Sequence, residues 1–484
     1  MLWLAIVFPE WPLQALFRGY HSSHAVAVAA GQRVLALDAA ALAQGVRAGQ
    51  RLADALALAP DLQIRPRDVA AEAAALQDIA GALLRFTPHV YLDQHGLLLE
   101  VAGSLKLFGG LDALRRKIRD SLSAGGFIAH MACAPTARAA HWLALGQPGS
   151  TIRSRDDLSD ALAGLPCSVL QIDSTALDLL RSAGLHTLGD AMRLPRDALA
   201  LRDAAMLRLH LDQALGLHPD IRTPHILPAR IESRLELPVP RHDIDVLLFA
   251  ASRLFSTACG QLAAAHGGIE HCVLELEHEH SHPSRLDIRT GTPTREAQKL
   301  ASLTREHLAR LSLPAPVSAL KLRMETLVLL AGRDQDMFGR QAPSARDRQE
   351  ACQVLVERLR ARLGRDAVHG LTACSDHRPE QMQRVVDPGQ AAPGAPRARR
   401  PLWLLAHPEP LTERHGQPWY HGPLECIGAA ERLETGWWEQ AGEEDAPGEA
   451  LRDYWIARGR RGEQLWIFRE HTSPHRWFLH GVFS

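Results

Sequence analysis

Residues 90–110 read VYLDQHGLLLEVAGSLKLFGG, and this stretch decides how the rest of the chain is interpreted. Its apolar run Leu97–Leu99 has the density of a strand that is buried on both faces. Gly103 and Ser104 then break the strand, and the run from Leu111 to Leu122 predicts a helix. A strand that enters a tight turn beneath a helix suits a nucleotidyl-transfer site, because carboxylates there can hold divalent metals against a triphosphate.

Composition indicates a folded, multidomain, cytoplasmic protein. The 484 residues are enough for several domains, and 46% of them are apolar. A net charge of −1 shows no overall preference for a polyanion, although such a chain can still concentrate arginine on one face. The seven cysteines are scattered without a C-x-x-C spacing, which predicts reduced thiols and neither a disulfide framework nor a zinc site.

The first 62 residues predict a strand, two further strand-like runs and two short helices. The opening MLWLAIVFPEWP is apolar, but it lacks a basic region and meets Glu10 and two prolines early. It therefore predicts a buried strand over Leu2–Phe8, and neither a signal peptide nor a membrane span. Two strand-like runs follow within 25–37, and residues 38–62 predict two short helices joined through Gly45 and Gly49.

These segments resemble the palm of Y-family DNA polymerases. In that family the first strand carries an Asp, and the strand matching Leu97–Leu99 is preceded by an Asp-Glu pair; these carboxylates hold the catalytic metals. The matching positions here are Val7, His95 and Gly96. Valine and glycine offer no ligand, and a lone histidine is a poor ligand for magnesium. The resemblance therefore implies a polymerase frame with no catalytic residues, no metal and no cofactor.

Two further segments of the resemblance lack their triphosphate contacts. The fingers of the family carry a Tyr and an Arg before a Gly-Val pair, and Ala39 and Leu42 hold those places here. The segment APTARAAHWLALGQPG is similar to the family's A-P-N-K segment, whose lysines face the triphosphate, yet residues 131–150 contain no lysine. The alternative is an active polymerase with relocated ligands, for which Glu10, Asp93 and Glu100 are the candidates.

Residues 177–195, LDLLRSAGLHTLGDAMRLP, predict two helices around a short turn that contains Gly184 and Gly189. The segment resembles the helix-hairpin-helix of a polymerase thumb, where backbone N–H groups reach a DNA phosphate because glycine lets the main chain approach closely. A plain helical hairpin with capping glycines is the alternative reading.

Residues 230–330 predict the order β-α-β-β-α-β, a split βαβ unit. It resembles the little-finger domain of Y-family polymerases. The last strand alternates apolar residues with Lys321 and Arg323, so one sheet face is expected to lie under helices and the other to stay free for a phosphate backbone. The candidate DNA-binding residues of this domain are Arg285, Arg289, Lys321 and Arg323.

The polar segment GRDQDMFGR follows the little-finger region. It resembles a degenerate sliding-clamp-binding peptide, with Asp334 where the family has Gln. The implied clamp-binding residues are Gln335, Asp336, Met337 and Phe338. An exposed Met-Phe pair in an ordinary linker is the alternative.

Seven of the ten tryptophans lie after Leu402, which predicts a folded module. LRDYWIAR and EQLWIFRE flank Gly-Arg-Arg-Gly as a hairpin, and RWFLHGVF adds a strand. These motifs, with PLWLLAHPEPL and ETGWWEQ, resemble the ImuB subfamily, Y-family-like proteins of a bacterial damage-induced mutagenesis cassette. The resemblance implies as partners damaged primer-template DNA, the sliding clamp, ImuA, RecA and an error-prone C-family polymerase, and it implies no membrane.

We therefore expect an α+β multidomain protein with a Y-family-like right hand and a tryptophan-rich C-terminal β module. The expected function is a non-catalytic, DNA-binding and protein-docking platform in translesion synthesis. The expected domains are palm 1–25 and 77–165, fingers 26–76, thumb 166–228, little finger 229–331, a segment with clamp motif, helix and linker 332–400, and a protein-interaction module 401–484.

Overall fold

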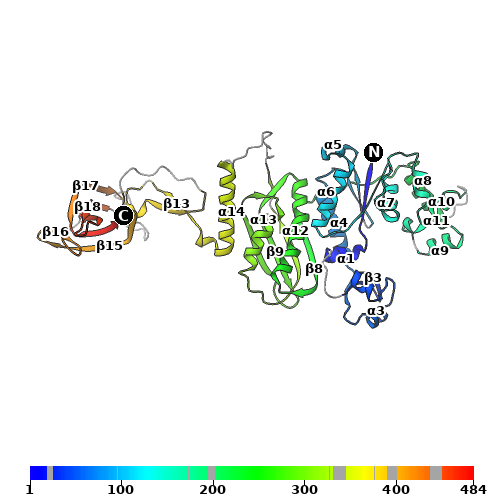
Figure 1. The fold of residues 1–484 in the computed structure, drawn as a ribbon, viewed down its shortest axis with the longest axis horizontal. Helices are drawn as coiled ribbons and strands as arrows, with labels where there is room; N and C mark the ends of the chain where they lie inside the picture. Colours follow the sequence, from blue (N-terminus) through cyan, green and yellow to red (C-terminus); the bar gives the residue numbers. More distant parts are fainter. Residues whose placement is uncertain are drawn as a thin grey trace. The chain divides into compact units, whose positions relative to one another are not determined.

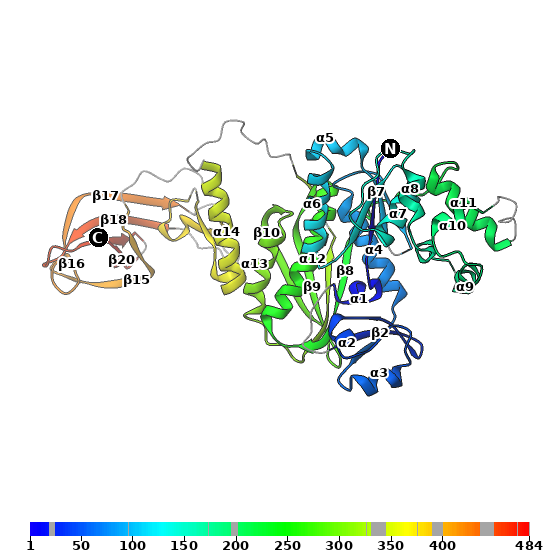
Figure 2. The same ribbon diagram turned by 45° about the vertical axis from the view of Figure 1, so that its right-hand side comes forward.

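The computed structural model describes residues 1–484 apart from 19–24, 95, 173, 195–201, 326, 331–344, 375, 390–399, 436–449, 472 and 484. The described chain forms two compact units, Met1–Arg362 and Leu363–Ser484. The first unit contains the palm, fingers, thumb and little finger that the sequence predicts, and the second contains the tryptophan-rich β module (Figures 1 and 2).

The palm is an antiparallel sheet with strand order β5-β6-β1-β7. Alternation along β1 directs Leu4 and Ile6 into one core and Ala5 and Val7 into another, so the strand is buried on both faces as predicted. Helices α4 and α6 cover the first face and α7 the second (Figure 1). The palm elements are β1 (Trp3–Val7), α1 (Trp11–Phe17), α4 (Val69–Leu83), β5 (Val90–Asp93), β6 (Gly96–Glu100), η1 (Ala102–Ser104), α5 (Leu105–Phe108), α6 (Leu111–Ala124), β7 (His130–Ala134) and α7 (Ala137–Gly146).

The fingers form a small lobe with its own core, built on a sheet of order β3-β2-β4. The two strand-like runs and two short helices expected from the sequence are all present. The elements are β2 (Val26–Ala30), β3 (Arg33–Leu37), α2 (Ala39–Ala43), α3 (Leu52–Leu58) and β4 (Gln63–Pro66).

The thumb is helical and shares a core with α7 on the second face of the palm sheet. Figure 2 shows its helices α8 to α11 beyond α7. The elements are α8 (Leu158–Ala163), η2 (Cys167–Leu170), α9 (Ser174–Ser182), α10 (Leu188–Met192) and α11 (Arg202–Leu215).

The little finger has the predicted β-α-β-β-α-β order and a sheet of order β10-β9-β11-β8. Strand β11 lies between β8 and β9, which is the split βαβ arrangement. The core helix α12 is long and apolar enough to cross a membrane. However, 67% of its most apolar 18-residue stretch is buried inside the protein. The elements are β8 (Ile231–Arg241), α12 (Ile244–Ala264), β9 (Gly267–His278), β10 (Ser284–Thr294), α13 (Ala297–Leu308), β11 (Val317–Met324) and β12 (Val328–Leu329).

Palm and little finger are joined by a buried contact between α4 and α12. Gly260 of α12 lies so close to α4 that an added Cβ would be 2.8 Å from the Cβ of Ala82. Beside it, Arg18 forms a 3.1 Å ion pair with Asp78, and the Asp78 carboxylate also accepts hydrogen bonds from Ser233 and Gln261 of the little finger. Burial raises the pKa of Asp78, and the neighbouring Arg18 guanidinium opposes this rise.

Helix α14 (Ala345–Leu363) packs on the little finger through an ion pair of 2.9 Å between Glu357 and Lys299. The second unit begins at Leu363, earlier than the boundary at 401 that we expected. Glu380 binds Arg452 of β18 at 2.9 Å, which ties the segment before 401 to the module. The elements are η3 (Arg365–Ala367), β13 (Gly370–Ala373), η4 (Pro379–Gln381), β14 (Gln383–Val386), β15 (Trp403–Arg414), β16 (Gln417–Trp419), β17 (Glu425–Thr435), β18 (Ala450–Arg458), β19 (Gln464–Glu470) and β20 (Trp477–Val482).

Candidate palm site and nucleic-acid interface

The palm sheet brings the expected metal positions together but gives them no metal-binding chemistry. Strand register places Val7 opposite Gly96, and Gly96 opposite Asp93 on the next strand. Residues directly opposite one another in antiparallel strands share a face, so the three form one row across the sheet. The Val7 side chain is only 5% exposed and packs in the core beneath α7. His95, the remaining expected position, lies outside the described residues.

Gly96 has no room for a side chain. A Cβ built on Gly96 would lie 2.3 Å from the backbone oxygen of Ile6 on the neighbouring strand. Backbone of a central strand cannot retreat from such a contact without disturbing the sheet. A carboxylate therefore does not fit at this position, and the row of Val7 and Gly96 does not fit a catalytic divalent metal.

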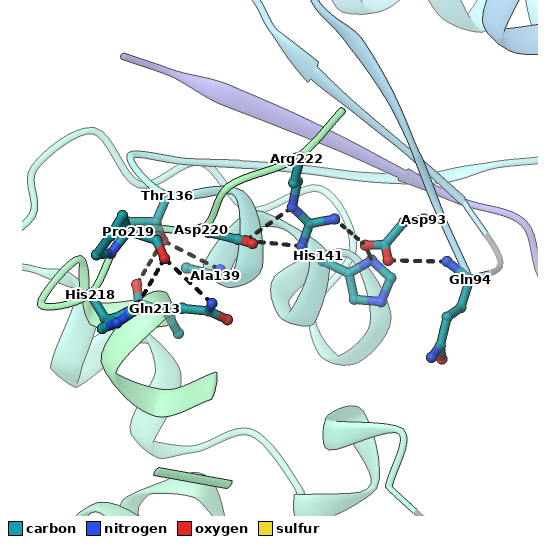
Figure 3. A network of polar contacts seen from close by, with 11 residues as sticks. Asp93, Gln94, Thr136, Ala139, His141, Gln213, His218, Pro219, Asp220 and Arg222 are labelled. Atoms are coloured by element: carbon teal, nitrogen blue, oxygen red, sulfur yellow. Dashed lines mark hydrogen bonds and ion pairs between the residues drawn. The ribbon is translucent and has the colours of Figure 1, made fainter. Parts of the chain in front are cut away.

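Asp93 is the one carboxylate in this row, and the side chains of Arg222 and His141 both bind it (Figure 3). Nη1 of Arg222 lies 3.4 Å from its Oδ2, and Nδ1 of His141 lies 3.2 Å from the same oxygen. Arg222 also binds Asp220 at 2.9 Å. His141 comes from α7, whereas Arg222 belongs to the chain between α11 and β8. The cluster thus fastens the connection from thumb to little finger onto the palm edge.

The backbone of the segment between α11 and β8 also runs beside the edge strand β5. The N–H of His225 donates to the carbonyl of Val90 at 2.7 Å, and Pro224 forms an isolated bridge with Tyr91. Burial lowers the pKa of His141, and the adjacent Asp93 carboxylate opposes that shift. The cluster is therefore a half-buried joint in which the Arg222 guanidinium lies beside the Asp93 carboxylate.

Replacing Arg222 by alanine is expected to lower the free energy of unfolding by about 2 kcal/mol, because Asp93 and Asp220 would lose their shared guanidinium in a poorly solvated place. Urea unfolding measures the change. The matched control is Arg181→Ala, which removes an exposed ion pair with Asp178 and is expected to cost less than about 0.5 kcal/mol. Equal effects of the two changes would contradict the joint.

The relocated ligands of the alternative reading do not meet. Glu100 lies opposite Trp3, at the other end of the strand pair from Val7 and Gly96, and its carboxylate accepts the N–H of Leu2 at 3.1 Å. Glu10 accepts the N–H of Leu37 at 3.2 Å. Among the residues that the structure describes, no three His, Cys, Asp or Glu side chains are grouped as a metal site.

The fingers also lack a triphosphate contact at the expected places. Ala39 and Leu42 lie on α2 with exposed, apolar side chains. The nearby Arg47 donates to the carbonyl of Leu42 at 3.0 Å and to that of Val46 at 2.9 Å. Its guanidinium therefore caps the end of α2.

Hydrogen bonds within the chain order the turn between α9 and α10. Gly184 adopts φ 76° and ends α9, but Gly189 lies inside α10, where an added Cβ would be 2.9 Å from the carbonyl oxygen of Ala163. The N–H groups of His186 and Thr187 both donate to the Asp190 carboxylate, at 3.2 and 2.9 Å. These bonds describe a capped helical hairpin, and contact with a DNA phosphate through Gly184 and Gly189 stays a prediction.

The free face of the little-finger sheet carries the four predicted basic residues, but carboxylates alternate with them. Lys321 pairs with Glu232, Arg323 with Glu275 at 3.0 Å, and Arg285 with Asp287 at 3.2 Å. Arg289 is exposed and has no ion pair with any described residue. The face is therefore charge-balanced and not simply basic. Exposed ion pairs are weak, so a phosphate backbone can replace these carboxylates.

The predicted clamp-binding residues Gln335, Asp336, Met337 and Phe338 lie outside the described residues. Sequence reasoning missed two clusters that the structure shows, Asp93 with Arg222 and Arg18 with Asp78. Their partners are 129 and 60 positions apart in the sequence, and no local motif marks either pair.

Comparisons with known proteins agree with this architecture. A family model described as the impB/mucB/samB family matches residues 16–144, from the end of α1 through fingers and palm to α7. The chain is 30% identical over 463 residues to Protein ImuB of Caulobacter vibrioides strain NA1000 / CB15N, covering 91% of this chain and 100% of that protein. Protein ImuB of strain ATCC 19089 / CIP 103742 / CB 15 matches with the same values.

Among solved structures, a Dbh ternary complex is similar at 17% identity and a TM-score of 0.39, covering 67% of this chain and 98% of that one. DinB from Sulfolobus solfataricus is similar at 17% identity and a TM-score of 0.38, covering 68% and 100%. The identity of 30% along the whole length of the Caulobacter relative decides the assignment. The chain belongs to the ImuB family of Y-family polymerase-like proteins.

Proposed function

We propose that this chain is a non-catalytic polymerase homologue that binds DNA and docks other proteins during damage-induced translesion synthesis and mutagenesis. The observation that supports it most is the row of Asp93, Gly96 and Val7, in which one carboxylate is held by Arg222, one position has no room for a side chain and one is apolar. Phosphoryl transfer depends on metal ions that neutralise the developing charge, and this row does not supply their ligands.

The test is primer extension with purified full-length chain in magnesium and in manganese. We expect no template-dependent extension above that of a buffer control, because the metal ligands are missing. A Glu10→Gln, Asp93→Asn, Glu100→Gln triple variant is the control for a contaminating polymerase. Extension by the wild type that disappears in this variant would show an active enzyme with relocated ligands and would overturn the proposal.

DNA binding is assigned to the free face of the little-finger sheet. Replacing Arg285, Arg289, Lys321 and Arg323 by alanine is expected to weaken binding to primer-template DNA. The slope of log K against log salt concentration is expected to become shallower by about 3 to 4, because each phosphate contact contributes about 0.9 to it. Fluorescence anisotropy over a salt series measures both quantities.

A second variant, which removes carboxylates from the same face, is a control that is expected to change DNA affinity in the opposite direction. Replacing Glu232 and Glu275 by glutamine and Asp287 by asparagine removes negative charge from the same surface, so this variant is expected to bind primer-template DNA more tightly than the wild type. If the two variants leave affinity and salt dependence unchanged, the little-finger sheet does not face DNA.

The docking role extends to the partners that the family resemblance implies. We propose that the chain bridges the sliding clamp and an error-prone C-family polymerase, with ImuA and RecA as further partners, in the cytoplasm. The clamp contact is assigned to Met337 and Phe338, because paired apolar anchors dominate interfaces of this kind. The C-terminal module is assigned to protein contacts.

A further inference from the structure

One surface of the C-terminal module combines unpaired arginines with partly exposed aromatic rings. It is formed by Arg414, Trp419, Tyr420, Arg458, Arg460 and Arg461, and we refer to these residues as the hairpin surface. The four arginines are exposed and the two rings are half-buried. The residues come from the β15–β16 hairpin, the segment that follows it, the end of β18 and the β18–β19 turn.

Side-chain contacts and chain continuity connect Arg414, Trp419, Tyr420 and Arg460 across the two hairpins. The Arg414 guanidinium lies over the Trp419 ring, 4.8 Å from its centroid. Tyr420 follows Trp419, and its ring meets that of His421 edge-on at 4.5 Å. The Arg460 side chain lies against Gly422, where an added Cβ would be 3.1 Å from Cδ. Arg414 therefore lies over Trp419, and Arg460 lies beside the segment that follows Tyr420.

The charge of this surface differs from that of the little finger. On the little-finger sheet, carboxylates pair with Lys321, Arg323 and Arg285. None of the four arginines of the hairpin surface forms an ion pair with a described residue. An unpaired guanidinium keeps its full attraction for an anion, and its planar donors match a phosphate.

We propose that the hairpin surface binds single-stranded nucleic acid, with phosphates on the arginines and bases stacked on Trp419 and Tyr420. Sites that bind single strands without sequence preference combine a positive track with aromatic platforms, because every base has a π-face. An acidic peptide would use the arginines and leave the two ring faces unused, so the combination favours a nucleic acid. This site is separate from the primer-template contacts proposed for the little finger.

The experiment measures binding of labelled oligothymidylate to the full-length chain by fluorescence anisotropy over a salt series. Replacing Arg458, Arg460 and Arg461 by alanine is expected to weaken binding about tenfold or more. The slope of log K against log salt concentration is expected to become shallower by about 2, because each phosphate contact on a single strand contributes about 0.7 to it. Trp419→Leu is expected to weaken binding about fivefold or more at every salt concentration, since stacking is not screened.

A charge-matched control tests whether a loss of binding comes from this site or from the change in net charge. Replacing Arg116, Lys117 and Arg119, which are exposed on α6, by alanine removes the same three charges and is expected to leave oligothymidylate binding unchanged. Thermal unfolding of each variant checks that the module is folded. If Trp419→Leu unfolds the module, the arginine variant and its salt dependence alone decide the outcome.

Two results would overturn the proposal. One is equal affinity and salt dependence of the arginine variant and the wild type. The other is binding of a labelled glutamate-rich peptide that depends on the three arginines while oligothymidylate binding does not, which would make this a docking site for an acidic protein. The little-finger variant distinguishes the two DNA sites, because it is expected to lose primer-template binding and to keep oligothymidylate binding.

Discussion

Replacing Gly96 by alanine is expected to lower the free energy of unfolding by about 3 kcal/mol, a large effect for the addition of one methyl group. The new Cβ would lie 2.3 Å from the carbonyl oxygen of Ile6, whose strand lies between β6 and β7 in the centre of the palm. Neither strand can move without disturbing the cores on both faces of the sheet. Urea unfolding of the full-length chain measures the loss.

Gly103 provides the matched control. It lies seven residues later, outside the left-handed region, with no atom within 4 Å of an added Cβ. Gly103→Ala is expected to change the free energy of unfolding by less than about 1 kcal/mol. If Gly96→Ala is tolerated equally well, the close approach of β1 and β6 is not as described. The same contact predicts that a carboxylate side chain placed at position 96 would destabilise the palm still more than alanine does.

Replacing Arg18 by methionine is expected to cost about 3 kcal/mol, because it leaves the Asp78 carboxylate buried without its charge partner. Arg18 is 1% exposed, and its pair with Asp78 lies in the contact between palm and little finger. The control Arg305→Met removes an exposed pair with Asp245 and is expected to cost less than about 0.5 kcal/mol. Chemical unfolding at pH 8 compares the two variants.

The cost of Arg18→Met is expected to shrink as the pH falls. Burial raises the pKa of Asp78, and removing Arg18 removes the main opposing influence. A carboxyl whose pKa is higher in the folded state binds more protons there than in the unfolded state, so its contribution to stability increases as pH decreases toward the unfolded pKa. The stability difference between wild type and variant is therefore smaller at pH 5 than at pH 8.

A double variant separates charge from packing. Arg18→Met combined with Asp78→Asn removes both charges and keeps an amide for Ser233 and Gln261, and it is expected to be more stable than Arg18→Met alone. A double variant no more stable than the single variant, together with a difference that does not depend on pH, would mean that Asp78 is not a buried charge at this contact.

Much of the fold follows from patterns within short segments. Three features depend on local periodicity and turn residues, so they could be predicted. They are the burial of Leu97–Leu99 on both faces, the glycine-linked helices of the fingers and the split βαβ unit. The start of the second unit at Leu363 could not, because the tie between Glu380 and Arg452 is a tertiary contact.

The candidate site was predictable only in part. The residues at the expected metal positions were identified, yet the lack of space at Gly96 depends on how closely β1 approaches β6. The basic residues of the little finger were placed on the free face of the sheet. The carboxylates that pair with Lys321 and Arg323 come from other strands, and register decides which side chains pair. The Asp190 carboxylate that accepts the N–H groups of the turn after Gly184 was not indicated by the sequence pattern.

The joint between Asp93 and Arg222 supplies a positive charge beside the carboxylate from the chain itself. A bound Mg²⁺ exchanges with the solvent, so a chelator or a fall in free magnesium can remove it. The Arg222 guanidinium is covalently part of the chain, and its positive charge stays beside Asp93 at every magnesium concentration. EDTA is therefore expected to leave the melting temperature of this protein unchanged, so that the palm would hold its shape under magnesium starvation.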